Sequence, residues 1–211
     1  MAALGVDKVY RFVQFASNKE TRGWVSPAEF NIAAELAQIA AYSKREAVFL
    51  QTKKVLNDMR PFMKLSAAIT PSVGICAYPA DLRHFLNAWK VADYKPITEL
   101  TQGEFSGVMD SSIVPPSSDY LACVQRDDGL YIYPATSTAD VQMEYIKIPT
   151  APEWAYTTSS GRPVYDSGNS TDFEFDEISF LEISTNILLH VGLNIKDDTV
   201  AQYGAAFNQQ A

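Results

Sequence analysis

The most constraining feature of this sequence is the way the spacing of its apolar residues changes along the chain. Near both ends, apolar residues recur every three or four positions, the period of a helix. In much of the middle, from residue 62 to 78 and again from 121 to 148, they alternate, which is the period of a strand. Helices and strands are therefore segregated. This favours an α+β fold, with N-terminal helices, a central antiparallel β region containing a hairpin, and two C-terminal helices, over a doubly wound parallel sheet.

The same patterns predict the individual elements. The expected helices cover residues 7–16, 26–49, 51–59, 79–89, 101–109, 176–192 and 198–208. The expected strands cover residues 62–69, 72–78, 121–126, 130–133 and 141–148, with extended segments at 94–100 and 172–175. Asp127-Asp128-Gly129 predicts a hairpin turn, and Gly192 predicts a helix end. The Ser-, Thr- and Gly-rich residues 155–171 predict a long exposed loop.

Three regions follow from this order of elements. Residues 1–115 form a mainly helical body with a short β-hairpin, and residues 116–176 form a β region with the long loop. Residues 177–211 supply the closing helices, which we expect to fold with the N-terminal body as one compact unit. A chain of 211 residues is long enough for one domain or two small ones.

The segment NKETRGWVSPAEF, residues 18–30, has two interpretations. In a calcium loop of the EF-hand type, the side-chain ligands and the turn glycine would be Asn18, Glu20, Ser26, Glu29 and Gly23. The spacing fits, but the first ligand is neutral, and Arg22 places a cation where an oxygen ligand belongs.

The second interpretation is the start of a helix. Ser26 and Glu29 have the spacing of a capping box, in which the side chain of each residue accepts a hydrogen bond from the backbone N–H of the other. Pro27 occupies the first helical position, where its missing N–H costs nothing. Val25 and Phe30 stand at the positions of a hydrophobic staple. The residues therefore favour a firmly specified helix over a calcium site.

The helix expected at 26–49 carries a stripe of small residues. The stripe consists of Phe30, Ala33, Ala34, Ala37, Ala40 and Ala41. Because small side chains allow close approach, we expect this helix to pack against other helices along its length. Lys44, Arg45 and Glu46 mark its polar end.

Composition excludes several classes of function. The net charge of −8 argues against a basic protein that grips nucleic-acid phosphates. Hydrophobic residues make up 47% of the chain, which argues against wholesale disorder. Cys76 and Cys123 lie among apolar residues without metal-ligand spacing, so we expect buried free thiols. We expect no signal peptide and no membrane span, because no apolar run is long enough.

No catalytic, cofactor or metal site is predicted. The two histidines, His84 and His190, fall on separate expected helices and have no implied partner, so we expect structural or surface roles for both. No nucleophile motif or phosphate-binding glycine loop is present. The acidic pairs Asp127-Asp128 and Asp197-Asp198 are typical of turns and helix starts. A hydrolase that uses two carboxylates stays open as an alternative, since such pairs meet only in three dimensions.

Three aromatic residues, Trp154, Tyr156 and Tyr165, lie in or beside the expected loop. Tyrosine and tryptophan are enriched at protein interfaces, so contact with a partner chain is one interpretation. Packing of these rings back onto their own fold is the other.

Several short runs resemble a known family. The residues of the N-terminal run that match it are Asn18, Lys19, Gly23, Trp24, Ser26, Pro27, Glu29, Phe30, Asn31 and Gln38. Similar runs follow in the same order: SSIVPPSSDYLACV, VQMEYIKIPTAPEW and STDFEFDEISFLEISTNILLHVGLNI. Together they resemble ring or head–tail connector proteins from the neck of crAss-like tailed bacteriophages. The alanine-rich helix and the Lys44-Arg45-Glu46 patch, where the family has a more acidic and aromatic stretch, depart from the pattern.

The resemblance implies a virion structural protein that assembles in the host cytoplasm and catalyses no reaction. Copies would form a ring, expected to be twelvefold, that joins the portal protein to neighbouring neck or tail rings. Genomic DNA would pass through without sequence-specific binding. A tail-hub or other tail-associated protein is the alternative in the same setting, and a virion-borne hydrolase or a calcium-binding module is the alternative outside it. We also expect residues 149–171 and the last helix to reach onto neighbouring subunits or rings.

Overall fold

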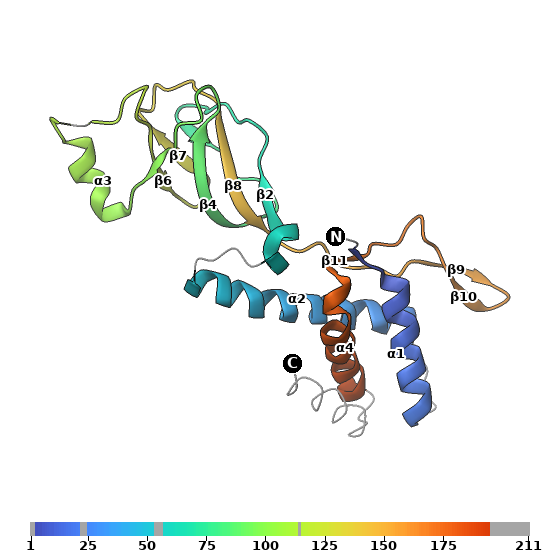
Figure 1. Ribbon diagram of the computed structural model, residues 1–211. Coiled ribbons are helices and arrows are strands. Elements are labelled where there is room, and N and C mark those ends of the chain that lie inside the picture. Colours follow the sequence, from blue (N-terminus) through green and yellow to red (C-terminus); the bar gives the residue numbers. More distant parts are fainter. Residues whose placement is uncertain (1–2, 22–24, 53–56, 114, 195–211) are drawn as a thin grey trace. The chain divides into compact units, whose positions relative to one another are not determined.

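A computed structural model describes residues 3–21, 25–52, 57–113 and 115–194 (Figure 1). The fold contains both helices and antiparallel sheets and belongs to the α+β class, as predicted. The chain divides into two compact units, one built from residues 1–61 and 149–211 and the other from residues 62–148. The boundaries expected from the sequence lay after residues 115 and 176. No helix among the described residues combines the length and apolar character needed to cross a membrane.

Among the described residues, the first unit contains three helices and two short antiparallel pairs of strands. The helices are α1 (Val6–Thr21), α2 (Pro27–Thr52) and α4 (Phe180–Asn194), with a 3₁₀ turn, η2 (Glu177–Ser179), directly before α4. The strand pairs are β1 (Ala3–Leu4) with β11 (Phe173–Asp176), and β9 (Tyr156–Ser159) with β10 (Arg162–Tyr165). Helix α4 packs against both α1 and α2. The closing helix therefore folds with the N-terminal helices.

Local sequence specifies the start of α2. The Ser26 backbone N–H and hydroxyl both donate to the Glu29 carboxylate, at 3.0 and 2.7 Å, and the Glu29 N–H donates to the Ser26 hydroxyl. These bonds lower the pKa of Glu29 below its usual value, because they favour the charged carboxylate. Val25 and Phe30 are both buried. The predicted capping box is confirmed, and a second capping box, formed by Thr101 and Glu104, begins a helix in the other unit.

A row of polar residues on α2 holds the rest of the first unit in place. Asn31, Gln38 and Arg45 are spaced seven residues apart, so they lie on one face of the helix. The Trp154 N–H donates to Asn31 Oδ1 at 2.9 Å, and Asn31 Nδ2 donates back to the Trp154 carbonyl. Gln38 Nε2 donates to the Thr150 carbonyl at 2.6 Å, and Gln38 Oε1 accepts from the Glu174 N–H. Each amide thus binds backbone as a neighbouring strand would.

Arg45 completes this row. Its guanidinium donates to Glu182 on α4 at 2.7 Å and to the Ser179 hydroxyl, and lies over the Phe175 ring. The Arg45 side chain is only 13% exposed, and Glu46 is buried. The segment interpreted from sequence as a polar helix end is therefore largely inside the fold. The reason is that α4 supplies a carboxylate to Arg45, whose guanidinium also donates to the Ala41 carbonyl of α2.

Loss of the Gln38 amide should destabilise the fold measurably. We expect Gln38→Met to lower the free energy of unfolding by about 2 kcal/mol, because the Thr150 carbonyl and the Glu174 N–H lose their partner in a site closed to water. Chemical denaturation followed by circular dichroism would measure the change. The matched control is Gln125→Met, since Gln125 is exposed and bonds only to the exposed Glu99 among the described residues. Equal stability of the two variants would contradict the role assigned to Gln38.

An antiparallel sheet, a mixed sheet and a helix make up most of the described part of the second unit. The three-stranded sheet has the order β2 (Met63–Leu65), β8 (Val141–Lys147), β4 (Leu82–Lys90). The other has the order β3 (Ile75–Cys76), β7 (Leu130–Tyr133), β6 (Ala122–Gln125), β5 (Thr98–Glu99), with β5 parallel to β6. A 3₁₀ turn, η1 (Asn57–Phe62), precedes β2, and α3 (Gln102–Met109) follows β5.

Both sheets contribute to one buried core in this unit. The core residues are Cys76, Ala88, Ile97, Leu121, Cys123, Leu130, Ile132, Val141 and Met143. Both cysteines are free and buried, as expected, and burial raises the pKa of the Cys76 thiol to about 11 and that of Cys123 to about 12. At ordinary pH these thiols stay protonated, so they behave as apolar core groups.

The predicted hairpin at Asp127-Asp128-Gly129 joins β6 to β7. The Arg126 N–H donates to the Gly129 carbonyl across the turn. A Cβ at Gly129 would lie 2.6 Å from the Cys76 carbonyl oxygen, so the close approach of β3 requires glycine here.

The helix predicted at 79–89 is wrong, because this segment forms strand β4, which pairs antiparallel with β8. The pairing is irregular between Leu82 and His84 and again between Phe85 and Asn87. Such irregularities interrupt the alternation of a strand, and apolar residues then recur at the spacing of a helix. The strand therefore has the apolar pattern of an amphipathic helix.

The hairpin predicted from strands 62–69 and 72–78 is also wrong. Strand β2 pairs with β8, and β3 pairs with β7, so the two segments enter different sheets. Each segment pairs with a longer strand from later in the chain. The hairpin had been predicted because the two segments are close in sequence.

Three further expectations change. Residues 155–171 contain the β9–β10 hairpin instead of a structureless loop; its turn, Ser160-Gly161, has positive φ at both residues, a conformation typical of tight hairpins. Helix α4 continues past Gly192. In place of a helix at 51–59, α2 extends to Thr52 and a 3₁₀ turn covers Asn57–Phe62. The helix predicted at 198–208 lies outside the described residues.

Candidate functional site

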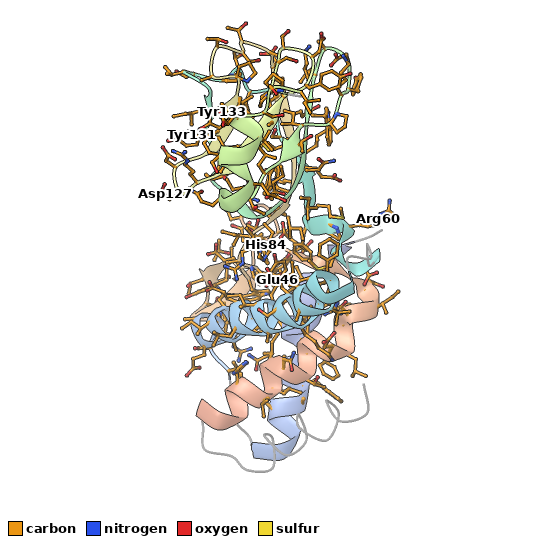
Figure 2. The ribbon with its side chains drawn as sticks, turned by 90° about the vertical axis from the view of Figure 1, so that its left-hand side faces the viewer. Glu46, Arg60, His84, Asp127, Tyr131 and Tyr133 are labelled. Carbon is orange, nitrogen blue, oxygen red and sulfur yellow. The ribbon has the colours of Figure 1, made fainter. Side chains whose placement is uncertain are left out.

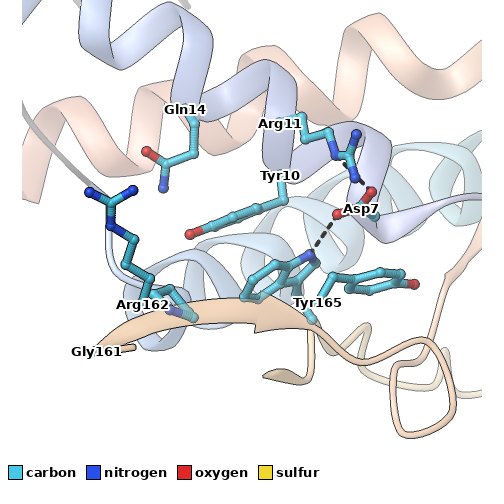
Figure 3. Close-up of a pocket in the computed structure, with 9 residues that line it drawn as sticks. Asp7, Tyr10, Arg11, Gln14, Gly161, Arg162 and Tyr165 are labelled. Carbon is cyan, nitrogen blue, oxygen red and sulfur yellow. Dashed lines mark hydrogen bonds and ion pairs between the residues drawn. The ribbon is translucent and has the colours of Figure 1, made fainter. Parts of the chain in front are cut away.

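Two surface features of the first unit stand out among the described residues. One is an open pocket of about 680 Å³ between α1 and the β9–β10 hairpin (Figure 3). The other is the outer face of α2. The first has the character of a binding site, and the second has that of a packing surface.

Stacked aromatic rings form the wall of the pocket. The Tyr10 and Trp154 ring centroids lie 4.1 Å apart, with 26° between the ring planes. Tyr165 stacks on Trp154 at 5.7 Å, and Tyr156 at 5.9 Å. Trp154 is only 3% exposed, so the interpretation of this ring as exposed is wrong: it packs on its own fold. Tyr156 is 47% exposed, and Tyr165 lines the pocket.

Polar side chains from both elements surround these rings. The Asp7 carboxylate accepts from Trp154 Nε1 at 3.1 Å and pairs with Arg11 Nε at 2.8 Å. Gln14 Nε2 donates to the Val25 carbonyl, whereas Gln14 Oε1 is buried without a hydrogen-bond partner. Figure 3 shows the Arg162 and Gln14 side chains pointing toward one another across the pocket. The pocket thus combines an apolar wall, two guanidinium groups and one unsatisfied acceptor.

The outer face of α2 is largely apolar and exposed, with Ser43 at its middle. Ile32, Leu36, Ile39 and Leu50 are between 46% and 63% exposed, and the smaller Ala40 and Ala47 lie between them. The spacing of three, four and seven residues places them on one side of the helix, along about 27 Å. The predicted alanine stripe packs on the opposite side, where Ala33, Ala34, Ala37 and Ala41 are buried. Ala40 is the exception, since it belongs to the outer face.

A helix that is apolar on both sides is typical of a helix buried on both sides. Scattered exposed apolar residues need no explanation, but a continuous row of them marks an interaction surface. The α2 outer face therefore has the properties of a surface that another protein covers.

The residues considered for chemistry come from different parts of the chain and lie on different elements. His84 lies on β4 in the second unit, and His190 lies on α4 in the first. Asp128 accepts from the Tyr131 hydroxyl beside the β6–β7 turn, and Figure 2 places Asp127 and Tyr131 at the outside of the second unit. Across the described parts of the chain, no group of His, Cys, Asp and Glu has the arrangement of a metal site.

For the calcium interpretation, Glu29 is the ligand position that the structure describes most fully. Its carboxylate accepts hydrogen bonds from Ser26, which is the arrangement of a capping box. The side chains of residues 18–24 lie outside the described part. Asp197 and Asp198 lie outside it as well.

Sequence reasoning did not predict the pocket. Its residues come from 7–14 and 154–165, two segments about 150 positions apart, and only the aromatic residues of the second segment were singled out. One indirect indication of this arrangement was present in the sequence. Asn31 and Gln38 are polar residues seven positions apart in an apolar helix, and such residues need hydrogen-bond partners. Comparison with protein-family models and with curated proteins found no match for this chain.

Proposed function

We propose that this protein is a structural subunit of an oligomeric ring in the neck of a tailed virus particle. The observation that supports it most directly is the α2 outer face, a mostly apolar row with Ser43 at its middle, along a helix of 26 residues. Such a surface is unfavourable in water and becomes favourable when a second copy covers it. When the covered patch meets a different patch of the next copy, repeated contacts close into a ring if the rotation allows.

The resemblance to crAss-like phage connector proteins supplies the setting. Asn31 and Gln38, two of the matching residues, bind backbone of Trp154 and Thr150, in the segment between β8 and the β9–β10 hairpin. The motif thus has a structural role in positioning an element that reaches away from the helices. The proposal includes twelve copies, contact with the portal protein and neighbouring rings, and no catalysed reaction.

The net charge suits a DNA conduit. With 25 acidic and 17 basic residues, the chain carries a formal charge of −8. Acidic side chains that line a channel repel the phosphates of a passing duplex and keep it from binding. We propose that part of this charge faces the channel.

Labelling of particles tests the proposed location. We expect an antibody against the chain, coupled to gold, to mark the junction between head and tail in electron micrographs of the phage that encodes it. Peptides of the chain should be present in purified particles at about twelve copies for each portal ring. Absence of the chain from purified particles would contradict the proposal, and labelling confined to the distal tail would support a tail-associated protein instead.

A further inference from the structure

The pocket between α1 and the β9–β10 hairpin contains an acceptor that the fold leaves unsatisfied. Gln14 Oε1 is buried and has no hydrogen-bond partner among the residues that the structure describes, whereas Gln14 Nε2 donates to the Val25 carbonyl. Buried polar atoms without a partner are rare, because each costs the free energy of its lost hydration. A ligand with an N–H or O–H group that enters the pocket would remove this cost.

Two guanidinium groups lie around the same pocket. Arg11 binds Asp7 through Nε, which leaves its terminal nitrogens for another acceptor, and its side chain is 76% exposed. Arg162 lines the pocket, and no ion pair involving it occurs among the described residues. Guanidinium groups bind carboxylates through two parallel hydrogen bonds. The pocket therefore selects a ligand with a negative charge.

The aromatic wall adds a third requirement. Tyr10, Trp154 and Tyr165 stack in series and present an apolar surface to the pocket. A ligand that meets all three requirements has a backbone N–H for Gln14, a carboxylate for Arg162 and an apolar part for the rings. An extended peptide segment with an acidic residue has all three.

We propose that this pocket binds an acidic peptide segment of a second copy of this chain. This rests on the proposed function, in which one subunit contacts the next through two different surfaces. Charge favours this occupant, because another copy with a net charge of −8 offers many carboxylates and the pocket offers two arginines. A single-stranded nucleic acid also combines planar rings with negative charge, and a binding measurement with an oligothymidylate distinguishes it from a second copy.

Charge reversal at Arg162 tests the proposal on the full-length protein. In sedimentation velocity at 100 mM NaCl, we expect Arg162→Glu to weaken self-association about tenfold or more, and Arg162→Gln to give a smaller loss. The matched control is Arg60→Glu, which makes the same change of charge at an exposed arginine outside the pocket and should associate as the unchanged protein does. Thermal unfolding by circular dichroism should be alike for all three variants, because Arg162 has no ion pair among the described residues to lose.

Three outcomes would overturn the proposal in different ways. If Arg162→Glu associated as strongly as the unchanged protein, the pocket would not be part of the interface, whereas the proposed ring would not be contradicted. If the unchanged protein stayed monomeric up to about 100 μM, a second copy would not be the ligand of the pocket. This result would also count against the ring. Binding of a fluorescent fifteen-residue oligothymidylate that Arg162→Glu abolishes would assign the pocket to nucleic acid.

Discussion

The double substitution Leu36→Asp with Ile39→Asp is expected to convert the assembled protein into monomers. Both side chains are 46% exposed on the α2 outer face, so an interface that covers them gains about half of the free energy of a full burial, roughly 0.7–1.4 kcal/mol, from each. Replacing them with charges removes this gain and adds the cost of burying a carboxylate. The dissociation constant should rise by at least about a hundredfold, measured by sedimentation velocity or light scattering after gel filtration.

The fold of the monomer should survive this change, because the buried side of α2 is untouched. The control is Ile178→Asp, at an apolar residue that is 89% exposed beside α4 and outside the α2 outer face. This variant should assemble normally. If the double variant assembled as the unchanged protein does, the α2 outer face would not be an interface between copies.

Trp154→Ala is expected to destabilise the first unit by about 3–5 kcal/mol. The ring is 3% exposed, stacks on Tyr10 and donates to Asp7, so its removal leaves a large cavity between α1 and the hairpin. The backbone of residue 154 would keep its bonds to Asn31, and the loss would report on the ring itself. Thermal and chemical unfolding would measure the change, which is a large share of the stability of an ordinary domain.

Tyr156→Ala provides the comparison for Trp154. Tyr156 stacks on the same ring from its outer side and is 47% exposed, so its removal should cost less than about 1 kcal/mol. If Trp154→Ala unfolded at the same temperature as the unchanged protein, the ring would not belong to the core. It would then be available to a partner, as the alternative interpretation of the sequence holds.

The elements that the sequence predicted well are those with local determinants. Ser26 and Glu29 lie three residues apart and fix the start of α2 without help from the rest of the chain. Asp128-Gly129 likewise fixes the turn between β6 and β7. Each of these patterns carries its own hydrogen bonds, so the environment does little to change the outcome.

The failures involve distant partners. The apolar residues of β4 have helical spacing because the pairing with β8 is irregular, and β8 lies about 60 positions further along the chain. Arg45 was assigned to a polar helix end, since nothing near it in sequence indicates Glu182. The pocket needs α1 and the β9–β10 hairpin together, and Gln14 becomes an unsatisfied acceptor only in that setting. Tertiary contacts override local periodicity at each of these positions.

Images of the purified protein by electron microscopy, at concentrations where it associates, test the central claim most directly. The claim is that each copy covers the α2 outer face of the next copy with a different surface, and that these repeated contacts close into a ring. Class averages should show closed rings of uniform size with rotational symmetry and a central opening, twelvefold if the resemblance extends to copy number. Separate monomers or closed dimers without an opening, seen across the concentration range, would contradict it.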